Sequence, residues 1–395
     1  MNAPRTRYPT LACALASGVL ASALTPVAAA QTFLTNDIYL ISPVVPDPSN
    51  GTIVNGILRI TPGTWAKTLV YSDPIVNGAG AYDPARDRMV LPMLPLRLVA
   101  ADGTTSTIAL SWGNGPSLVA PVGDGRIYIW SPQTNDARRI IYVDNANVQH
   151  TLMNDANTAP FVPPADFLAL MYDRATNSLL GGGGGAVDSF VVKMPLSPAG
   201  DRIQGAVVTA TINASTSGEV VVALSRGPGG KAFVKIDDNS NDTNPRMQTI
   251  DPVTMVAQPF ASSGYFGVGG EVAGVYDPFL GAAVVLDSLN DVLRTFGSGA
   301  SGDGIIVTRG VSNGGASGEL AQLILPRPPQ LCAGDIAPPG FGNGIVDVND
   351  LLAVITAWGN CPAPCPPTCA ADVNHDCVVN VNDLLAIITS WGACP

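Results

Sequence analysis

The chain has 395 residues, enough for two or three domains, and its 46% hydrophobic content argues against an intrinsically disordered protein. Only 13% of the residues are charged, while there are 42 glycines and 34 prolines, which favours an all-β fold with many tight turns. The net charge of −11 and the lack of a cluster of Lys and Arg argue against nucleic-acid binding, which needs basic side chains to replace counterions.

The N-terminal segment 1–30 has the pattern of a signal peptide. Arg5 and Arg7 precede a mostly apolar stretch at 11–24, and small residues then provide a cleavage site after Ala30. The apolar stretch is too short to span a bilayer comfortably, although a membrane anchor is the alternative interpretation. No later stretch is long and apolar enough for a transmembrane helix. We therefore expect the mature chain to be secreted or held at the cell surface by a partner, without a transmembrane segment.

Residues 31–325 have the pattern of a mainly β domain. β-Branched and aromatic residues alternate or run together in short segments, such as 37–41 and 126–130, bounded by Gly, Asn, Asp and Pro. Candidate strand starts recur on the order of 45 to 50 residues apart, close to the length of one four-stranded propeller blade. These starts are Tyr39, Ala81, Arg126, Ala169, Glu219 and Ala273, and six such units fit the length.

A weak Tyr-Asp repeat supports this interpretation. It occurs at 82–84, 172–174 and 276–278, each time leading through a turn into a strand, and Asp251 begins a degenerate copy. We expect the aspartate to accept backbone N–H groups in the turn, while a following proline presets its first corner. The repeat resembles the Tyr-Asp-Pro pattern of secreted β-propellers of the Kelch or NHL type, which implies a propeller of about six blades. A β-sandwich remains the alternative, because short strands at even spacing suit that fold too.

The body gives no assignment of catalytic residues. A lone histidine such as His150 is more often structural than catalytic on a β protein. Glycoside hydrolysis needs a pair of carboxylates, and the only glutamates of the body are Glu219, Glu271 and Glu319 among many aspartates that the sequence cannot place together. The glycine run 181–185 is not followed by Lys-Ser or Lys-Thr, so we expect a mobile turn between strands instead of a phosphate loop.

The composition changes completely after a short connector at 326–331. Its three prolines indicate a stiff, extended linker, so we place the domain boundary there. The following segment, 332–395, contains six of the seven cysteines and a duplication in which 344–361 matches 377–394. An even number of cysteines in a small exported module predicts disulfides.

The second copy has the spacing of a calcium-binding loop. Calcium binds about six to eight oxygen atoms, and an EF-hand loop supplies them from positions 1, 3, 5, 7, 9 and 12. A loop that starts at Asp372 has an oxygen donor at every one of these positions. The predicted ligands are Asp372, Asn374, Asp376, the carbonyl of Val378, Asn380 and Asp383. Val379, at position 8, is expected to form a β-bridge with the other loop.

The first copy is less regular. Asp335 is the expected position 1, but an insertion separates it from the rest of the loop, and position 3 has no clear occupant. The predicted ligands of this site are Asp335, Asn343, the carbonyl of Ile345, Asp347 and Asp350. Every acidic residue of 332–395 falls on a ligand position of the two loops, and the segment has no Lys or Arg. It therefore predicts two bound calcium ions, which would offset the repulsion between the carboxylates.

A helix is expected after each loop. Apolar residues recur there at helical spacing, and Gly359 and Gly392 follow as helix stops. We expect the two apolar stripes to pack on each other as a small core stapled by calcium and disulfides. The stripes are Leu351, Leu352, Val354, Ile355 and Trp358 in the first copy, and Leu384, Leu385, Ile387, Ile388 and Trp391 in the second. The duplication favours the disulfide pairing Cys332–Cys361, Cys369–Cys394 and Cys365–Cys377 among the possible connectivities.

Segment 332–395 resembles a type I dockerin. Aspartate at position 12, no helix before the loop and a helix after it distinguish the segment from calmodulin-like EF-hands. The resemblance implies a small α-helical domain that binds a cohesin domain through loop positions 10 and 11. Those residues are Val348, Asn349, Val381 and Asn382, identical in the two copies, so that a two-fold alternative binding mode is conceivable. The basic residues that many dockerin helices carry are absent, which leaves another surface protein as an alternative partner.

Two functions fit these features. In the first, a secreted calcium-binding protein uses its dockerin-like tail to attach a non-catalytic β-propeller to a partner protein or surface. In the alternative, the propeller is a carbohydrate-active enzyme, a glycoside hydrolase or polysaccharide lyase, that takes part in polysaccharide degradation. The first function is favoured because no catalytic residues can be assigned. The second rests on analogy, because many dockerins are attached to polysaccharide-degrading enzymes.

Overall fold

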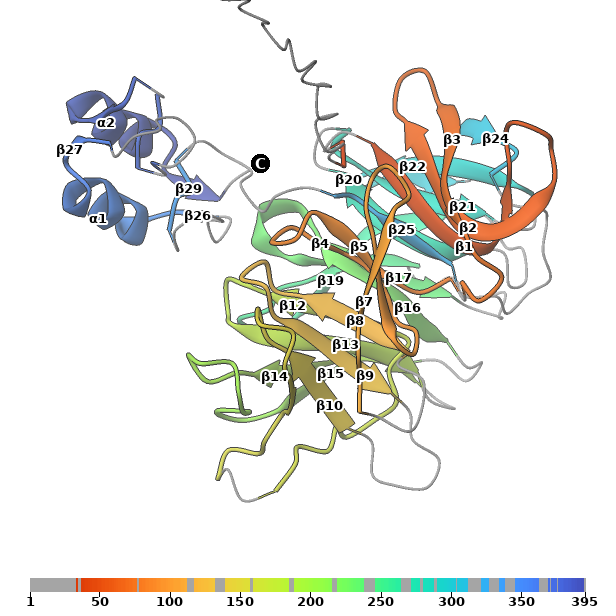
Figure 1. Ribbon diagram of the computed structural model, residues 1–395, viewed down its shortest axis with the longest axis horizontal. Helices are drawn as coiled ribbons and strands as arrows, with labels where there is room; N and C mark the ends of the chain where they lie inside the picture. Colours follow the sequence, from red (N-terminus) through yellow and green to blue (C-terminus); the bar gives the residue numbers. More distant parts are fainter. Residues whose placement is uncertain are drawn as a thin grey trace, which may run out of the picture. The chain divides into compact units, whose positions relative to one another are not determined.

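The computed structural model of the chain (Figure 1) shows a β domain followed by a short tail with two helices. It describes residues 33–34, 37–76, 78–111, 117–131, 139–156, 159–184, 188–214, 219–237, 246–263, 271–277, 280–287, 290–302, 304–311, 321–326, 334–337, 345–361, 369, 371–374 and 376–393. The expected signal peptide and its cleavage site lie outside these residues.

The β domain is a six-bladed β-propeller, because it has six sheets that each contain four antiparallel strands, and one of these sheets has a fifth, parallel strand. The prediction of about six blades is thereby confirmed, and the β-sandwich alternative is wrong. Blade 1 contains β1 (Ile38–Pro46), β2 (Ile53–Thr61), β3 (Ala66–Ser72) and the distant β25 (Gln322–Ile324). Blade 2 contains β4 (Ala81–Asp83), β5 (Arg88–Leu91), β6 (Leu96–Val99) and β7 (Thr105–Ile108). Blade 3 contains β8 (Leu118–Pro121), β9 (Ile127–Ser131), β10 (Arg139–Val143) and β11 (Gln149–Thr151).

Blades 4 to 6 complete the ring. Blade 4 contains β12 (Ala169–Asp173), β13 (Ser178–Gly184), β14 (Asp188–Pro195) and β15 (Val208–Ala214). Blade 5 contains β16 (Val220–Arg226), the short 3₁₀ turn Pro228–Gly230, β17 (Ala232–Asp237), β18 (Met247–Ile250) and β19 (Ala257–Ser263), with β23 (Ser301–Gly302) pairing in parallel along β19. Blade 6 contains β20 (Glu271–Asp277), β21 (Ala282–Asp287), β22 (Val292–Gly297) and β24 (Ile305–Arg309).

The ring is closed by a strand from the end of the β domain. Strand β25 pairs antiparallel with β1, where Leu323 faces Leu40, and the N–H of Gly80 donates to Oε1 of Gln322 at 2.9 Å. Along the rest of the ring, the first strand of each sheet contacts the first strand of the next. Of the expected strand starts, Tyr39 lies in the second strand of its blade and Arg126 immediately precedes the second strand of its blade, because blade 1 takes its first strand from β25 and β8 precedes Arg126.

The glycine run is part of a strand and not a mobile turn, so that expectation was wrong. Residues Gly181–Gly184 pair along β13. A Cβ on Gly182 would lie 2.4 Å from Cγ1 of Val221, and one on Gly184 would lie 2.2 Å from the carbonyl oxygen of Glu219. Both neighbours belong to blade 5 or its approach, so these glycines allow the two blades to pack closely.

The hydrophobic core lies between neighbouring blades. One buried cluster joins Ile38 and Leu58 of blade 1 to Val284 and Leu293 of blade 6, and Leu323 of the closing strand packs into it. We expect Leu323→Ala to lower the free energy of unfolding by about 2–5 kcal/mol, because a buried leucine leaves a cavity when truncated. Urea denaturation measures this, with Val253→Ala as the control because Val253 is 72% exposed. Equal midpoints for the two variants would contradict a closing role for β25.

The tail contains two short helices, the only α-helices among the described residues, each preceded by a short strand and followed by another. The elements are β26 (Ile345–Val346), α1 (Val348–Thr356), β27 (Gly359–Asn360), β28 (Val378–Val379), α2 (Val381–Thr389) and β29 (Gly392–Ala393). Strand β26 pairs with β29, and β27 pairs with β28. Each loop therefore pairs with the strand that follows the other helix. The expected β-bridge between the two loops is wrong, since Val379 faces Gly359.

The tail core uses only one face of each helix. Val354 and Ile387 are fully buried with Val346 and Val379. Leu351 and Leu384 are partly buried and pack against this cluster. The remaining predicted core residues are about half exposed, namely Leu352, Ile355 and Trp358 on the first copy and Leu385, Ile388 and Trp391 on the second. The expectation that the complete stripes pack on each other is therefore wrong, because a helix of nine residues buries a single face in so small a core.

The disulfide arrangement differs from the preferred pairing. Cys361 is bonded to Cys369, which excludes Cys332–Cys361 and Cys369–Cys394. The pairing of β27 with β28 brings the end of the first copy beside the start of the second, so the shorter link forms. Cys377 also takes part in a disulfide, and its partner lies outside the described residues, as do Cys332, Cys365 and Cys394.

Candidate functional site

The loop of the second copy is organised by its own carboxylate and amide side chains. Asp372 accepts the N–H groups of Asp376 at 3.1 Å and of Cys377 at 2.8 Å. Oδ1 of Asn374 accepts the Asp376 N–H at 2.9 Å, and Oδ1 of Asp376 accepts the Val378 N–H at 2.9 Å. The side chains at positions 1, 3 and 5 therefore turn toward the same stretch of backbone, as a loop with alternating oxygen donors requires.

Asp383, at position 12, connects the start of the loop to the start of α2. Its Oδ1 accepts the N–H groups of Val373 at 2.8 Å and Asn374 at 3.2 Å, while Oδ2 accepts the N–H of Asn380 at 2.8 Å. The side chain of Asn380 in turn caps the helix by accepting the N–H of Asn382. This is a capping box, which stabilises the first turn of a helix.

The first copy repeats this arrangement. Oδ1 of Asp350 accepts the N–H groups of Ile336 and Ala337 at 2.7 Å each, and Oδ2 accepts the N–H of Asp347 at 2.8 Å. Ile336 follows Asp335 directly, as Val373 follows Asp372, so the structure makes Asp335 and Asp372 equivalent despite the insertion. The predicted ligand Asn343 lies outside the described residues, and only the backbone of Ile345 is described.

Cys377 occupies the position where an EF-hand loop normally has glycine. Its φ is 68°, in the left-handed region that glycine adopts without a steric penalty. The backbone at position 6 thus has the conformation that the loop requires, although the residue type differs. A disulfide anchors this cysteine, which fits the idea that a covalent link supports the turn.

The burial of the two position-12 aspartates bears on whether the tail could bind a cation. Asp350 and Asp383 are 0% exposed, and 332–395 has no Lys or Arg to balance them. Ionised carboxylates are costly to bury unless hydrogen bonds and a positive charge compensate. No three His, Cys, Asp or Glu side chains gather as metal ligands in the described part of the chain. Amide and carbonyl oxygens complete the predicted donor set, and such an all-oxygen set fits calcium.

The predicted recognition residues lie on the surface at the first turn of each helix. Val348 and Val381 are each 54% exposed, and Asn349 and Asn382 are exposed beside them. Each valine lies in line with the half-exposed apolar residues of its helix, so the two copies have matching apolar strips on their surfaces. The strips are Val348, Leu352, Ile355 and Trp358 on α1, and Val381, Leu385, Ile388 and Trp391 on α2.

In the propeller, a cavity of about 300 Å³ opens where the first strands of the blades end. It is lined by residues of all six blades, from the ends of β4, β8, β12, β16, β20 and β25. Its polar lining includes Tyr82, Tyr172, Asp173, Arg174, Arg226, Lys231 and Tyr276. Sequence reasoning missed this site, because a central cavity exists only once the blades form a ring.

The Tyr-Asp repeat shapes the hairpins at this end of the propeller. Asp83 accepts the N–H of Ala85 at 3.1 Å, Asp173 that of Thr176 at 3.0 Å and Asp277 that of Leu280 at 3.2 Å, which confirms the predicted turn role of the aspartate. Asp251 accepts the N–H groups of Val253 and Thr254 in the same way, but it follows β18, so its turn lies elsewhere in the blade.

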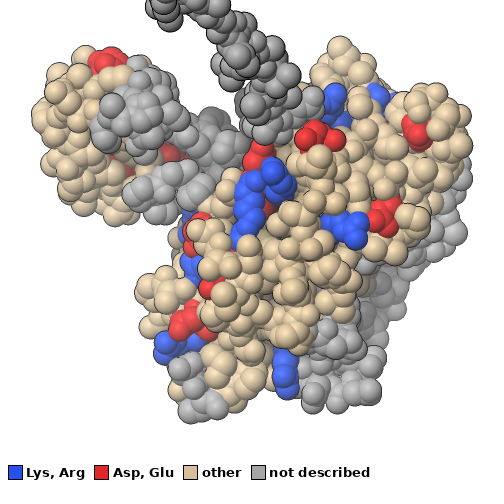
Figure 2. All heavy atoms as spheres, in the orientation of Figure 1, with Lys and Arg blue, Asp and Glu red and all other residues tan. Residues whose placement is uncertain are grey.

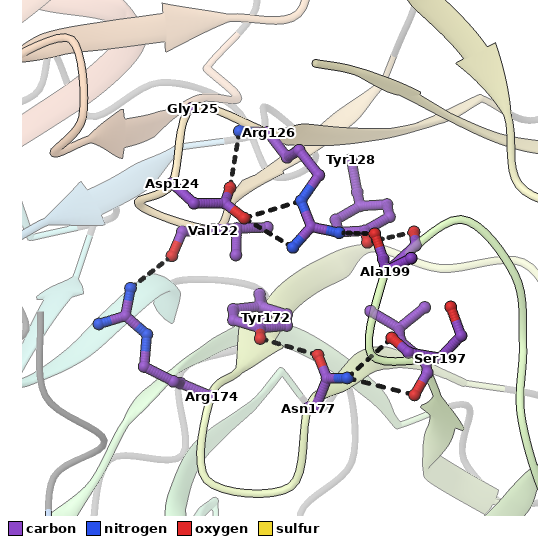
Figure 3. A network of polar contacts seen from close by, with 12 residues as sticks. Val122, Asp124, Gly125, Arg126, Tyr128, Tyr172, Arg174, Asn177, Ser197 and Ala199 are labelled. Atoms are coloured by element: carbon purple, nitrogen blue, oxygen red, sulfur yellow. Dashed lines mark hydrogen bonds and ion pairs between the residues drawn. The ribbon is translucent and has the colours of Figure 1, made fainter. Parts of the chain in front are cut away.

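The tyrosine of the repeat is held by the same hairpin (Figure 3). The hydroxyl of Tyr172 donates to Oδ1 of Asn177 at 2.9 Å, and Nδ2 of Asn177 donates to the carbonyls of Leu196 and Ser197. Asn177 has φ 45°, a conformation that asparagine tolerates better than most residues. Tyr82 donates to Asp87 in the same manner, so the feature recurs in two blades.

We expect Asn177→Ala to destabilise the propeller by about 1–3 kcal/mol, because it removes three hydrogen bonds and places alanine at positive φ. Tyr172→Phe removes only one of these hydrogen bonds and is the matched control. In urea denaturation, the free energy of unfolding should be lowest for Asn177→Ala, intermediate for Tyr172→Phe and highest for the parent chain. The reverse order would show that the asparagine is not the anchor of the hairpin.

Charged side chains are sparse and mixed on the face shown in Figure 2. Basic groups lie beside acidic ones, and most of the described surface there is neither. Ion pairs such as Arg126–Asp124 at 2.6 Å and Arg97–Asp73 at 2.6 Å are examples from the propeller. Among the described residues, no helix has the length and apolar character needed to cross a membrane.

No protein-family description matches the chain, and no curated protein sequence matches it. Solved structures share the architecture. A candidate gluconolactonase matches with a TM-score of 0.41 and 11% identity, covering 66% of this chain and 90% of its own. TolB from Acinetobacter baumannii matches with a TM-score of 0.45 and 10% identity, covering 73% of this chain and 66% of its own. Scores this low carry no argument about function, and the propeller assignment rests on the strand pairing.

Proposed function

We propose that the chain is an exported calcium-binding protein whose dockerin-like tail, residues 332–395, attaches the β-propeller to a partner protein. The observation that carries the proposal is the repeated loop and helix in which Asp350 and Asp383 hold equivalent, fully buried positions. Two copies of one device, each with buried carboxylates in a segment without Lys or Arg, suit two bound cations.

Calcium would be held by the predicted donors of each loop. In the second loop these are Asp372, Asn374, Asp376, the carbonyl of Val378, Asn380 and Asp383, and in the first they are Asp335, Asn343, the carbonyl of Ile345, Asp347 and Asp350. The ion would balance the carboxylates and couple each loop to its helix, because folding and metal binding share their free energy. The Cys361–Cys369 disulfide supports export, since disulfides persist mainly in oxidising compartments.

The partner would dock on the exposed strip of α1 or α2. Val348 with Asn349, and Val381 with Asn382, lie at matching places on the two helices and share one sequence. A cohesin-like domain is the partner that the dockerin resemblance implies. Strips of this kind on a small domain mark protein interaction sites, because soluble monomers rarely expose contiguous apolar patches.

Calcium titration of the full-length protein tests the first half of the proposal. We expect isothermal titration calorimetry to show two binding events, and we expect a chelator to lower the stability of the tail while the propeller is unaffected. Hydrogen exchange, read separately for α1, α2 and the propeller strands, distinguishes the two parts. No heat of binding, together with exchange unchanged by the chelator, would refute calcium binding.

The second half is tested by surface capture of the calcium-loaded protein on immobilised cohesin domains. Binding that disappears with the chelator would support attachment through the tail. Calcium binding without capture by any cohesin would remove cohesin as the partner class.

A further inference from the structure

The disulfide of the tail lies against the second predicted calcium loop. Sγ of Cys361 is 3.8 Å from Oδ2 of Asp372, which holds position 1 of that loop. The N–H of Asp372 donates to the carbonyl of Cys369 at 3.2 Å, so both cysteines of the bond are neighbours of the same aspartate. Both cysteines are also partly buried against the core of the tail. The covalent bond is therefore part of the immediate surroundings of Asp372.

A closed circuit of links runs through this aspartate. Its carboxylate accepts the N–H of Cys377 at 2.8 Å, and the carbonyl of Cys377 accepts the N–H of Cys361 at 3.0 Å. The second of these hydrogen bonds continues the pairing of β27 with β28. Cys361 is bonded to Cys369, whose carbonyl accepts the N–H of Asp372 and completes the circuit. The hydrogen bonds of this circuit can open and close rapidly, whereas the disulfide holds its two ends together permanently.

The circuit fixes a carboxylate that water hardly reaches. Asp372 is 1% exposed, so its orientation depends on the neighbouring groups of the tail. The disulfide joins residues that are eight positions apart, and such a link reduces the conformational freedom of the chain before the loop is ordered. A loop whose first ligand is already in place loses less entropy when it closes around an ion.

The two cysteines can affect calcium only through other residues. Their sulfur atoms are bonded to each other, and calcium takes oxygen ligands. Groups that orient a metal ligand without touching the metal typically contribute about 10–100-fold to metal affinity. Cys361 and Cys369 stand in this relation to Asp372, one through the position of its sulfur and the other through its carbonyl.

We propose that the Cys361–Cys369 disulfide controls the calcium affinity of the second loop, so that this site reaches full affinity only after the chain has been oxidised. The inference rests on the calcium function proposed above and adds the regulation of one of its sites. The two cysteines act as positioning residues for Asp372. A reduced chain binds calcium weakly at this loop, and the oxidised chain binds it tightly.

Formation of the bond requires an external disulfide as the oxidant. The thiolate of one cysteine attacks that disulfide and forms a mixed disulfide with release of one thiol, and the second cysteine then displaces the other thiol. The two protein thiols lose two electrons and two protons, and the external disulfide becomes two thiols. Oxidising compartments outside the cytosol favour this exchange, so the site would mature during export.

Calorimetry on the full-length protein tests the inference by comparing the oxidised parent with the double variant Cys361→Ser and Cys369→Ser. We expect two binding events in the parent, and we expect the event of the second loop to be at least about tenfold weaker in the variant. The event of the first loop is the internal control and should keep its affinity. Asp376→Asn identifies the event of the second loop, because Asp376 is a predicted ligand of that loop alone and asparagine can still accept the N–H of Val378.

The outcomes separate this inference from the calcium function itself. No binding event in the oxidised parent would overturn both. Two events of parental affinity in the double variant would overturn the control by the disulfide and leave the calcium function intact. Hydrogen exchange of α1 and α2 at saturating calcium shows whether the tail of the variant is folded.

A redox titration of the parent tests the same coupling without a substitution. Alkylation of free thiols and mass spectrometry report the fraction of the Cys361–Cys369 bond in dithiothreitol buffers that contain either calcium or a chelator. Because coupling between two sites is reciprocal, calcium should protect this bond by the same factor by which the bond raises calcium affinity. We expect calcium to lower the reduction potential of the pair by about 30 mV for each tenfold change in affinity. The shift should be smaller in Asp376→Asn, and equal potentials with and without calcium in the parent would overturn the inference.

Discussion

Asp383→Ala is expected to abolish calcium binding by the second loop and to loosen α2. The side chain has two roles, as a predicted ligand and as the acceptor of three backbone N–H groups, from Val373, Asn374 and Asn380. Hydrogen bonds to a charged group contribute about 1.5–3 kcal/mol each, so the loss of three exceeds what a small tail can tolerate. Because outer-shell residues alone cost about 10–100-fold in metal affinity, removal of a ligand should cost at least about 100-fold.

Asp350→Ala provides an internal replicate of this experiment. It holds the equivalent place in the first copy, and its loss should affect the first site and α1 while the second site still binds. Asn382→Ala is the matched control, because Asn382 is exposed and is not a predicted ligand. Calorimetry counts the remaining sites, and hydrogen exchange follows each helix. Two intact binding events in Asp383→Ala would show that position 12 is not a ligand and that its role is confined to the capping box.

The sequence predicted the features that depend on local chemistry. The turn role of Asp83, Asp173 and Asp277 follows from hydrogen bonding within a few residues, and a helix after each loop follows from apolar residues at helical spacing. The number of blades followed from repeat length alone, because each blade is one local meander. Predictions of this kind require no knowledge of distant neighbours.

Features that depend on distant neighbours were predicted poorly. The strand pattern predicts a blade start at Tyr39, but the first strand of that blade comes from β25 near the other end of the domain. The disulfide pairing followed the duplication, whereas Cys361 pairs with Cys369 because the two copies are joined where β27 meets β28. The run Gly181–Gly184 was assigned to a turn, although the approach of blade 5 is what requires glycine.

The cavity illustrates the same limit for function. Ser225 and Arg226 stand in the places of the tyrosine and the aspartate, which is visible only after the register has aligned blade 5 with the Tyr-Asp blades. Before that, Arg226 is one arginine at the end of a strand. The turn-forming role of the aspartate explains why the Tyr-Asp pair recurs. A blade with other residues at these positions is then informative, because that role does not account for them.

The combined change of Leu352→Gln and Leu385→Gln is expected to abolish binding of a partner by the tail, whereas each single change should leave binding almost intact. The two leucines are 51% and 52% exposed at equivalent places on α1 and α2, within strips of the same composition. If either strip can serve as the docking face, loss of one removes half of the equivalent binding modes, which is about a twofold change in affinity. Loss of both removes the apolar contact that drives association.

Capture of the calcium-loaded protein by a cohesin domain measures this effect for the single and double variants. Val253→Gln in the propeller is the control for added polarity, because Val253 is exposed outside the tail. Calcium affinity should be the same in all variants, since neither leucine belongs to a predicted ligand set. A single variant that binds no partner would show that one strip alone forms the docking face, and a double variant that still binds would place the interface elsewhere on the tail. Either result would distinguish partner binding from calcium binding, because the leucine substitutions change the apolar strips and the aspartate substitutions change the calcium loops.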